Sequence, residues 1–140
     1  MPLREAIHRF YTDIILHELQ LMNKNPSYPN LTYNTFLYLS MITCKKNCTV
    51  SYIAETLHIS KSAVTIKVNE LIRQGLVQKI QSSSDKRVYY LSLDPKITED
   101  YSPEHRLDKA VGTIESNYTD EQVKMFCDML KFFTKVYLEE

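Results

Sequence analysis

The fold is decided by residues 49–93, which read TVSYIAETLHISKSAVTIKVNELIRQGLVQKIQSSSDKRVYYLSL. Apolar side chains recur at helical spacing over residues 50–57 and again over residues 64–72. The first run follows Thr49 and the second follows Ser60. Both residues are good N-terminal caps, because their hydroxyl groups accept a hydrogen bond from the first turn of a helix. Two short helices joined by a tight turn are therefore predicted.

The ends of these two helices carry their own signals. The first helix is expected to end near His58. Gly75 closes the second helix, at a position where a left-handed residue is preferred. Residues 76–81 and 88–93 then read as two strands, and residues 82–87 form a loop too polar to be buried. Two helices followed by this hairpin predict a winged helix-turn-helix.

One face of the second helix lies opposite the predicted buried stripe. It carries hydrogen-bond donors, acceptors and one aliphatic group: Lys61, Ser62, Thr65, Ile66, Asn69 and Arg73. Asparagine and lysine side chains can hydrogen-bond base edges, and an aliphatic side chain can touch a thymine methyl group. This face is therefore predicted to read the major groove of DNA.

The loop of the hairpin supplies a second predicted contact. Arg87 is expected to enter a groove with Lys86 beside it, and Asp85 is expected to hold the Arg87 guanidinium by a charge-assisted hydrogen bond. The chain of 140 residues has no net charge, but residues 61–87 hold six basic and two acidic residues, a net of +4. Residues 98–140 hold five basic and ten acidic residues, a net of −5. The basic segment coincides with the predicted DNA-binding surface.

Together these residues resemble the MarR family of bacterial transcription regulators. The resemblance rests on residues 59–65, Leu71, residues 75–77 and the Asp-x-Arg motif at residues 85–87. The chain departs from the family at His58, where glycine is frequent, and at Ile66, where arginine is frequent. Histidine is tolerated in place of that glycine because it enters the left-handed backbone region more readily than bulky residues do. It also reads Leu-Asp-Pro-Lys at residues 93–96, where the family usually reads Leu-Thr-x-x-Gly.

The resemblance implies a mainly α (α+β) architecture in one domain of 140 residues. Residues 31–97 would form the DNA-binding unit, and residues 1–24 and 102–140 would supply the helices that pair two copies. A two-fold dimer places its recognition helices about one duplex turn apart, roughly 34 Å. The expected DNA site is therefore pseudo-palindromic.

Helical patterns fill the rest of the chain. Apolar spacing predicts a helix over residues 3–22 and a loop at residues 25–30. A second helix runs from Thr32 to about Lys45, and its expected buried residues are Phe36, Leu37, Leu39, Ser40 and Met41. After the hairpin ends at Asp94-Pro95, Ser102-Pro103 is expected to begin a helix to about Asn117. The last helix follows the capping-box spacing of residues 119–122.

Cysteines and tyrosines are the remaining candidate site residues. The three cysteines, with Cys127 as the third, are expected to be free thiols. Cys44 and Cys48 flank two lysines, and positive charge favours a thiolate, so an oxidant sensor or part of a metal site is one interpretation. The preferred interpretation is structural: Cys44 packs in the core at a helix end, and Cys48 lies near a short strand. The four histidines lack the clustered spacing of metal ligands. The resemblance implies a ligand cleft that suits an aromatic or phenolic effector, and ordinary packing is the alternative for its residues. That cleft would be lined by Tyr11, Tyr33, Tyr38 and Tyr118.

The predicted function is a homodimeric, sequence-specific transcription regulator, most simply a repressor released by a small effector. Thiol-redox sensing through Cys44 and Cys48 is one alternative, and a winged-helix adaptor that does not bind DNA is another. An enzyme or a cofactor is not expected, because Gly75 and Gly112 are the only glycines and there is no phosphate loop or nucleophile elbow. The amino end has no apolar segment of membrane-spanning length, so the expected location is the cytoplasm.

Overall fold

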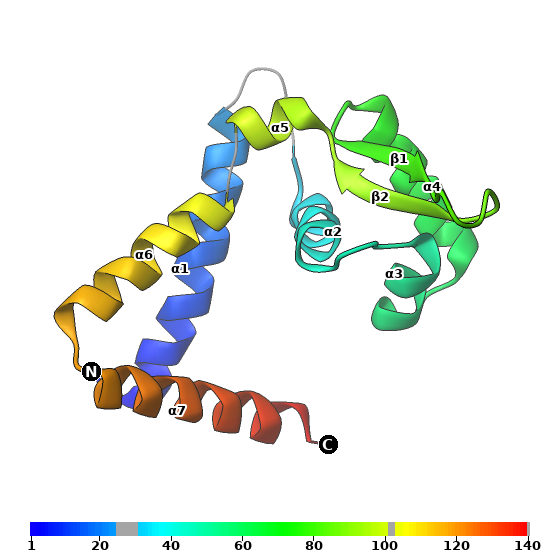
Figure 1. Cartoon of the computed structure of the whole chain (residues 1–140). Coiled ribbons are helices and arrows are strands. Elements are labelled where there is room, and N and C mark those ends of the chain that lie inside the picture. Colours follow the sequence, from blue (N-terminus) through cyan, green and yellow to red (C-terminus); the bar gives the residue numbers. More distant parts are fainter. Residues whose placement is uncertain (25–30, 101–102, 140) are drawn as a thin grey trace. The chain divides into compact units, whose positions relative to one another are not determined.

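The computed structural model describes residues 1–24, 31–100 and 103–139 of the chain. It divides into two compact units, Met1–Tyr101 and Ser102–Glu140. In its described residues, the first unit contains the following helices and strands: α1 (Leu3–Lys24), α2 (Tyr33–Cys44), α3 (Val50–Leu57), α4 (Lys61–Arg73), β1 (Val77–Gln81), β2 (Tyr89–Leu93) and α5 (Pro95–Asp100) (Figure 1). The second unit contains α6 (Pro103–Asn117) and α7 (Asp120–Leu138). The predicted winged helix-turn-helix and the mainly helical fold class are confirmed.

The turn between α3 and α4 is set by capping residues. The Thr49 hydroxyl accepts from the Tyr52 N–H at 3.1 Å, and the Ser60 hydroxyl accepts from the Ala63 N–H at 3.1 Å. His58 adopts the left-handed conformation at φ 54° and ψ 43°, and its N–H donates to carbonyl groups of α3. Gly75, at φ 72°, takes the same region directly after α4. These predictions from the sequence are confirmed.

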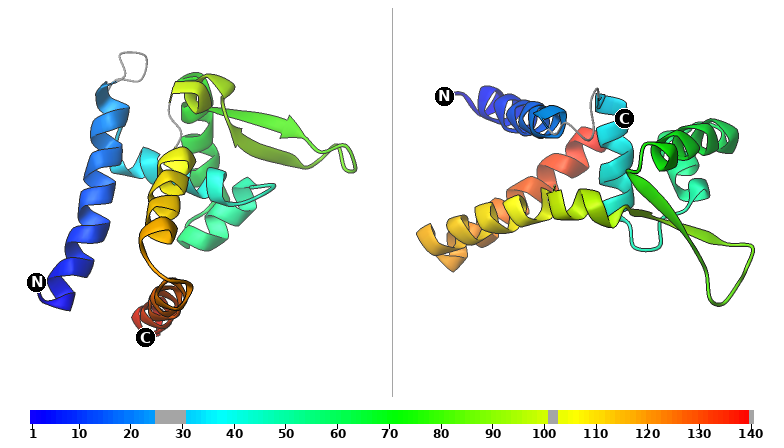
Figure 2. Two further views of the ribbon diagram at one scale, coloured as in Figure 1. Left: turned by 60° about the vertical axis from the view of Figure 1, so that its left-hand side comes forward. Right: turned by 90° about the horizontal axis from the view of Figure 1, so that it is seen from above.

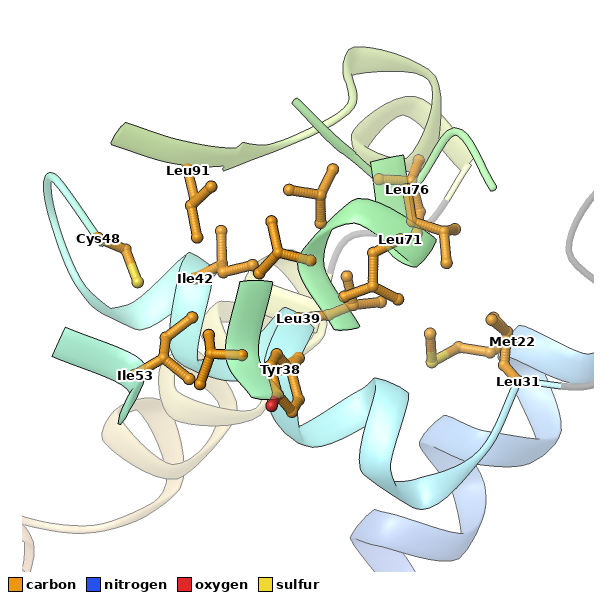
Figure 3. Packing of buried hydrophobic residues seen from close by; sticks show 14 of the residues in the cluster. Met22, Leu31, Tyr38, Leu39, Ile42, Cys48, Ile53, Leu71, Leu76 and Leu91 are labelled. Carbon is orange, nitrogen blue, oxygen red and sulfur yellow. The ribbon is translucent and has the colours of Figure 1, made fainter. Parts of the chain in front are cut away.

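The core of the first unit lies between α2, α3, α4 and the inner side of the hairpin (Figure 3). Its centre is fully buried, and it includes Ile53, Val64, Val68, Leu71 and Leu76. The carbonyl of Cys48 accepts from the Leu91 N–H at 2.8 Å, so the segment between α2 and α3 pairs with β2 at one residue. The face of α4 that carries Val64, Val68 and Leu71 is packed in this core.

The buried face of α2 differs from the predicted one. Of the predicted residues only Leu39 is buried, whereas Phe36, Leu37, Ser40 and Met41 are half-buried. The buried face is formed by Thr35, Tyr38, Leu39 and Ile42. Because apolar side chains lie almost all round this helix, its periodicity does not select one face. The packing of α2 against the rest of the unit makes that selection.

The hairpin is antiparallel, with Val77 opposite Leu93 and Gln81 opposite Tyr89. Each strand begins one residue later than predicted, at Val77 and Tyr89. In Figure 2 the hairpin projects from the helices, with the loop 82–87 at its free end.

One helix, α5, was not predicted. The hairpin ends at Asp94-Pro95 as expected, but Pro95 then occupies the first position of a short helix. The Asp94 carboxylate accepts from the Lys96 N–H at 3.0 Å and caps it, and Ile97 is buried in the core. Six residues carry too little periodicity to predict a helix.

The second unit has well-defined helices and no buried residue among the described side chains 106–139. Helix α6 ends at Asn117, as predicted. The predicted capping box is confirmed: the Gln122 N–H donates to the Thr119 hydroxyl at 3.3 Å, and the Thr119 N–H donates to the Gln122 side chain at 3.0 Å. The predicted loop at residues 25–30 and the predicted cap at Ser102 lie outside the described residues.

Among the helices that the structure describes, none combines the length and the apolar character needed to cross a membrane.

Candidate nucleic-acid interface

Helix α4 has one buried face and one open face. Val64, Val68 and Leu71 are completely buried, so this face anchors the helix in the core. The opposite face is open to solvent at every predicted DNA-contacting position except Thr65, which is half-buried; the exposed members are Lys61, Ser62, Ile66, Asn69 and Arg73. The structure therefore brings the predicted set together on one side of a rigid helix.

The hydroxyl groups on this face are already committed in part. The Thr65 hydroxyl donates to the Lys61 carbonyl at 2.8 Å, so it can offer a partner its lone pairs and its methyl group. The Ser62 hydroxyl lies 3.1 Å from that of Ser60, the residue that caps α4. Among the large apolar side chains exposed in residues 31–97, Ile66 is the most exposed, at 69%.

The tip of the hairpin presents an ordered arginine. The Arg87 side chain is 91% exposed, yet its Nε donates to Asp85 Oδ1 at 3.2 Å and its Nη2 donates to Asp85 Oδ2 at 3.3 Å. The Arg87 backbone N–H donates to the same carboxylate at 3.0 Å. The side-chain hydrogen bond from Arg87, followed by the backbone one, lowers the pKa of Asp85 from its ordinary value. The predicted pairing of Asp85 with Arg87 is confirmed.

The loop behind this pair is not wholly exposed, which corrects the expectation that it is too polar to be buried. Ser82 is buried, and its hydroxyl accepts from the N–H groups of Ser84 and Asp85, both at 3.3 Å. A buried hydroxyl is tolerated here because these hydrogen bonds replace its contacts with water. The sequence signal for such a turn is the run Ser-Ser-Ser-Asp at residues 82–85, because serine and aspartate side chains form hydrogen bonds with nearby backbone groups in turns.

Two further residues affect the charge of the surface. Lys67 belongs to the basic segment, but its side chain is only 16% exposed and pairs with Glu70 at 3.4 Å. The positive charge of the α4 face and the hairpin tip therefore comes from exposed side chains: Lys61, Arg73, Lys86 and Arg87, of which Arg87 is paired with Asp85. Positive groups at both the helix and the hairpin tip suit the phosphates of a duplex.

The tyrosines predicted to line an effector cleft have different environments. Tyr38 is buried in the core, and burial raises its pKa, whereas Tyr11 and Tyr33 are exposed. Tyr118, also exposed, belongs to the second unit. A pocket of about 590 Å³ lies along α7, and none of these four tyrosines lines it. The effector cleft stays a prediction.

The three cysteines are free thiols with different access to solvent. Cys48 is completely buried, but Cys44 is exposed like Cys127, so the predicted place of Cys44 in the core is wrong. Burial raises the pKa of the Cys48 thiol, against a smaller opposing effect of Lys45. Among the described residues, no group of three or more His, Cys, Asp or Glu side chains is arranged to hold a metal ion.

The fold and this surface together define a winged helix-turn-helix DNA-binding protein. The MarR family model matches residues 31–89, from the residue before the cap of α2 to the first residue of β2. The transcriptional regulator ZitR of Lactococcus lactis is 29% identical over 127 residues, which cover 86% of this chain and 85% of ZitR. The transcriptional regulator AdcR of Streptococcus pneumoniae is 30% identical over 96 residues, which cover 65% and 64% of the two chains.

A solved structure extends the likeness over nearly the whole chain. Streptococcus pneumoniae FabT, in its crystal structure with DNA, has a TM-score of 0.66 and 20% identity to this chain, and covers 96% of this chain and 93% of its own. Residues 31–89 therefore match the MarR family model, and the relatives to which the chain is similar are transcriptional regulators.

Proposed function

We propose that this protein is a homodimeric repressor that binds a pseudo-palindromic operator and is released by a small effector. The observation that carries the proposal is the division of α4 into two faces. Val64, Val68 and Leu71 fix the helix from behind, and its polar face remains available to base edges. An ordered Arg87 at the projecting hairpin tip supplies a second contact.

The proposed contacts divide between two grooves. The α4 residues would enter the major groove: Lys61, Ser62, Thr65, Ile66, Asn69 and Arg73. Lys86 and Arg87 would reach the flanking minor groove, with Asp85 orienting the guanidinium. Contacts to phosphates fix the register of the protein on the duplex, and contacts to base edges select the sequence.

The proposed homodimer is supported by apolar helices that their own unit leaves open. On α7 the exposed side chains include Phe126, Leu130, Phe133 and Tyr137, which recur at helical spacing. Leu107, Val111 and Ile114 form a similar exposed row on α6. Exposed apolar surface of this extent marks an interaction site, and a second copy supplies a self-complementary partner.

Release by an effector requires two dimer geometries with different spacing of the recognition helices. An effector shifts the balance only by its difference in affinity for the two geometries. An aromatic or phenolic compound is the proposed class. Oxidation of a thiol is the second candidate trigger; since Cys48 is buried with a raised pKa, it would act first on exposed Cys44.

Selection of duplexes from a randomised DNA library by the purified full chain tests the proposal. At roughly 150 mM salt non-specific binding is weak, so a recovered inverted repeat supports a sequence-specific dimer. Failure to enrich any motif, with folded and dimeric protein, would favour the adaptor.

The selected duplex then tests the contact made by the hairpin. Arg87→Ala is expected to weaken its binding by about 1–3 kcal/mol. Arg9→Ala on α1, where Arg9 pairs with Glu5 at 2.8 Å, removes the same charge far along the chain and serves as the control. Equal affinities of the two variants would exclude the proposed contact of Arg87.

A further inference from the structure

We propose that Gln81 is a positioning residue, which holds the hairpin tip in the geometry that presents Arg87 to DNA. Gln81 is the last residue of β1 and lies opposite Tyr89. Its Nε2 donates to the Lys86 carbonyl at 2.7 Å, across the loop, and lies 3.4 Å from the Tyr89 hydroxyl. The inference rests on the proposed binding of DNA and adds a role for a residue outside the predicted contact set.

The bond from Gln81 acts on one particular peptide group. The carbonyl of Lys86 and the N–H of Arg87 belong to the same planar peptide unit. Gln81 binds the carbonyl, while the Asp85 carboxylate accepts from the N–H at 3.0 Å. With both polar ends held, this unit has little freedom to rotate, and the direction in which Arg87 leaves the backbone is fixed.

The rest of the loop is held by hydrogen bonds to Ser82, the residue after Gln81. The Ser82 hydroxyl accepts from the N–H groups of Ser84 and Asp85, and the Ser82 N–H donates to the Val88 carbonyl at 2.9 Å. The Val88 N–H in turn donates to the Asp85 carbonyl at 3.0 Å. Asp85 is therefore anchored on the Ser82 side of the loop, and Gln81 anchors the Lys86–Arg87 peptide that Asp85 also holds.

An exposed network of this kind contributes little to folding but can contribute to binding. Gln81 is exposed, so water competes for its hydrogen bonds in the free protein. A flexible tip would have to be ordered when the duplex binds, whereas an ordered tip avoids that cost. The effect of Gln81 on affinity should therefore pass through Arg87 and disappear when Arg87 is removed.

The test uses the full chain and Gln81→Met, which keeps the length and charge of the side chain and removes its amide. Gln78→Met is the matched control, because Gln78 lies on the same strand and donates to the Ser92 hydroxyl at 3.1 Å, not to the loop. On a duplex recovered by selection, Gln81→Met should weaken binding about 3- to 10-fold, the effect of ordering one more flexible group. Gln78→Met should change it less than about 2-fold.

A double-mutant cycle separates positioning from a purely structural role. In an Arg87→Ala background, Gln81→Met should have an effect below about 2-fold, since the group that it positions is gone. An equal loss in both backgrounds would overturn the inference, as would unchanged binding by the single variant. An Arg87→Ala protein that binds like the wild type would instead overturn the proposed DNA contact itself.

Hydrogen exchange gives a readout that needs no DNA. The Arg87 N–H is bonded to Asp85 within the peptide unit that Gln81 holds, so Gln81→Met should speed its exchange, and Gln78→Met should not. Unchanged protection of this N–H in Gln81→Met would overturn the inference even if no operator were recovered.

Discussion

Helices α4 and α7 each carry an apolar stripe, but the two stripes differ in burial. On α4, Val64, Val68 and Leu71 are completely buried within their own unit, and Ile72 beside them is half-buried. The stripe of α7 recurs at the same spacing over more turns, and none of its residues is buried. The first unit therefore buries the stripe of α4 by itself, whereas the second unit leaves the stripe of α7 exposed, as the proposed homodimer requires.

The largest expected effect comes from a charge on the open stripe. Leu130→Glu should weaken self-association by about 3–6 kcal/mol, since a two-fold interface loses one buried leucine, worth about 1.5–3 kcal/mol, from each copy. Sedimentation over a concentration series measures the change. Lys131→Glu, on the polar side of α7, is the control. If Leu130→Glu remained as associated as the wild type, the stripe of α7 would not be the dimer interface.

A cavity in the buried stripe should affect folding instead. Leu71→Ala removes a completely buried side chain and is expected to lower the free energy of unfolding by about 2–5 kcal/mol. Urea unfolding, followed at a fixed protein concentration, gives this value. A loss below about 0.5 kcal/mol, as at ordinary surface positions, would contradict the packing of α4.

Ile66 is an exposed apolar side chain on the proposed DNA-contacting face of α4. If Ile66 covers a thymine methyl group in the major groove, Ile66→Ala should cost about 1 kcal/mol of operator affinity and leave self-association unchanged. Replacing the contacted thymine by uracil should cost the wild type a similar amount and the variant almost nothing. Equal sensitivity of both proteins to uracil would exclude the contact.

The smallest expected effect concerns pH at the hairpin tip. Because Arg87 lowers the pKa of Asp85 below its ordinary value of 3.8, the paired geometry is favoured above that pH and is lost as pH falls through the lower folded value. Arg87→Ala should return the pKa of Asp85 towards 3.8, and NMR titration of its carboxyl group measures this. An unchanged pKa would contradict the pairing.

Local sequence signals predicted local structure well. Thr49, Ser60 and Thr119 cap helices as expected, because a cap depends only on residues within one turn. His58 and Gly75 end helices for the same reason. Asp85 and Arg87, two residues apart, meet as their opposite charges indicate.

Features that depend on distant parts of the chain were harder to predict. The buried face of α2 is chosen by the elements packed on it, so its own apolar residues misled the prediction. Gln81 reads as an ordinary polar strand residue, and its bond to Lys86 becomes visible only once the hairpin register is known. The proposed dimer and effector depend on contacts with other molecules, which local signals in one chain do not encode.

Because Cys48 is completely buried, the rate at which its thiol is modified reports how often the first unit opens. This thiol is completely buried in the core, so a small alkylating reagent can reach it only while the unit is open. Cys44 is exposed, so its rate of modification in the same sample gives the rate expected for an accessible thiol. The lag between the two modifications therefore times the spontaneous opening of the DNA-binding unit, and an operator that tightens the unit should lengthen that lag.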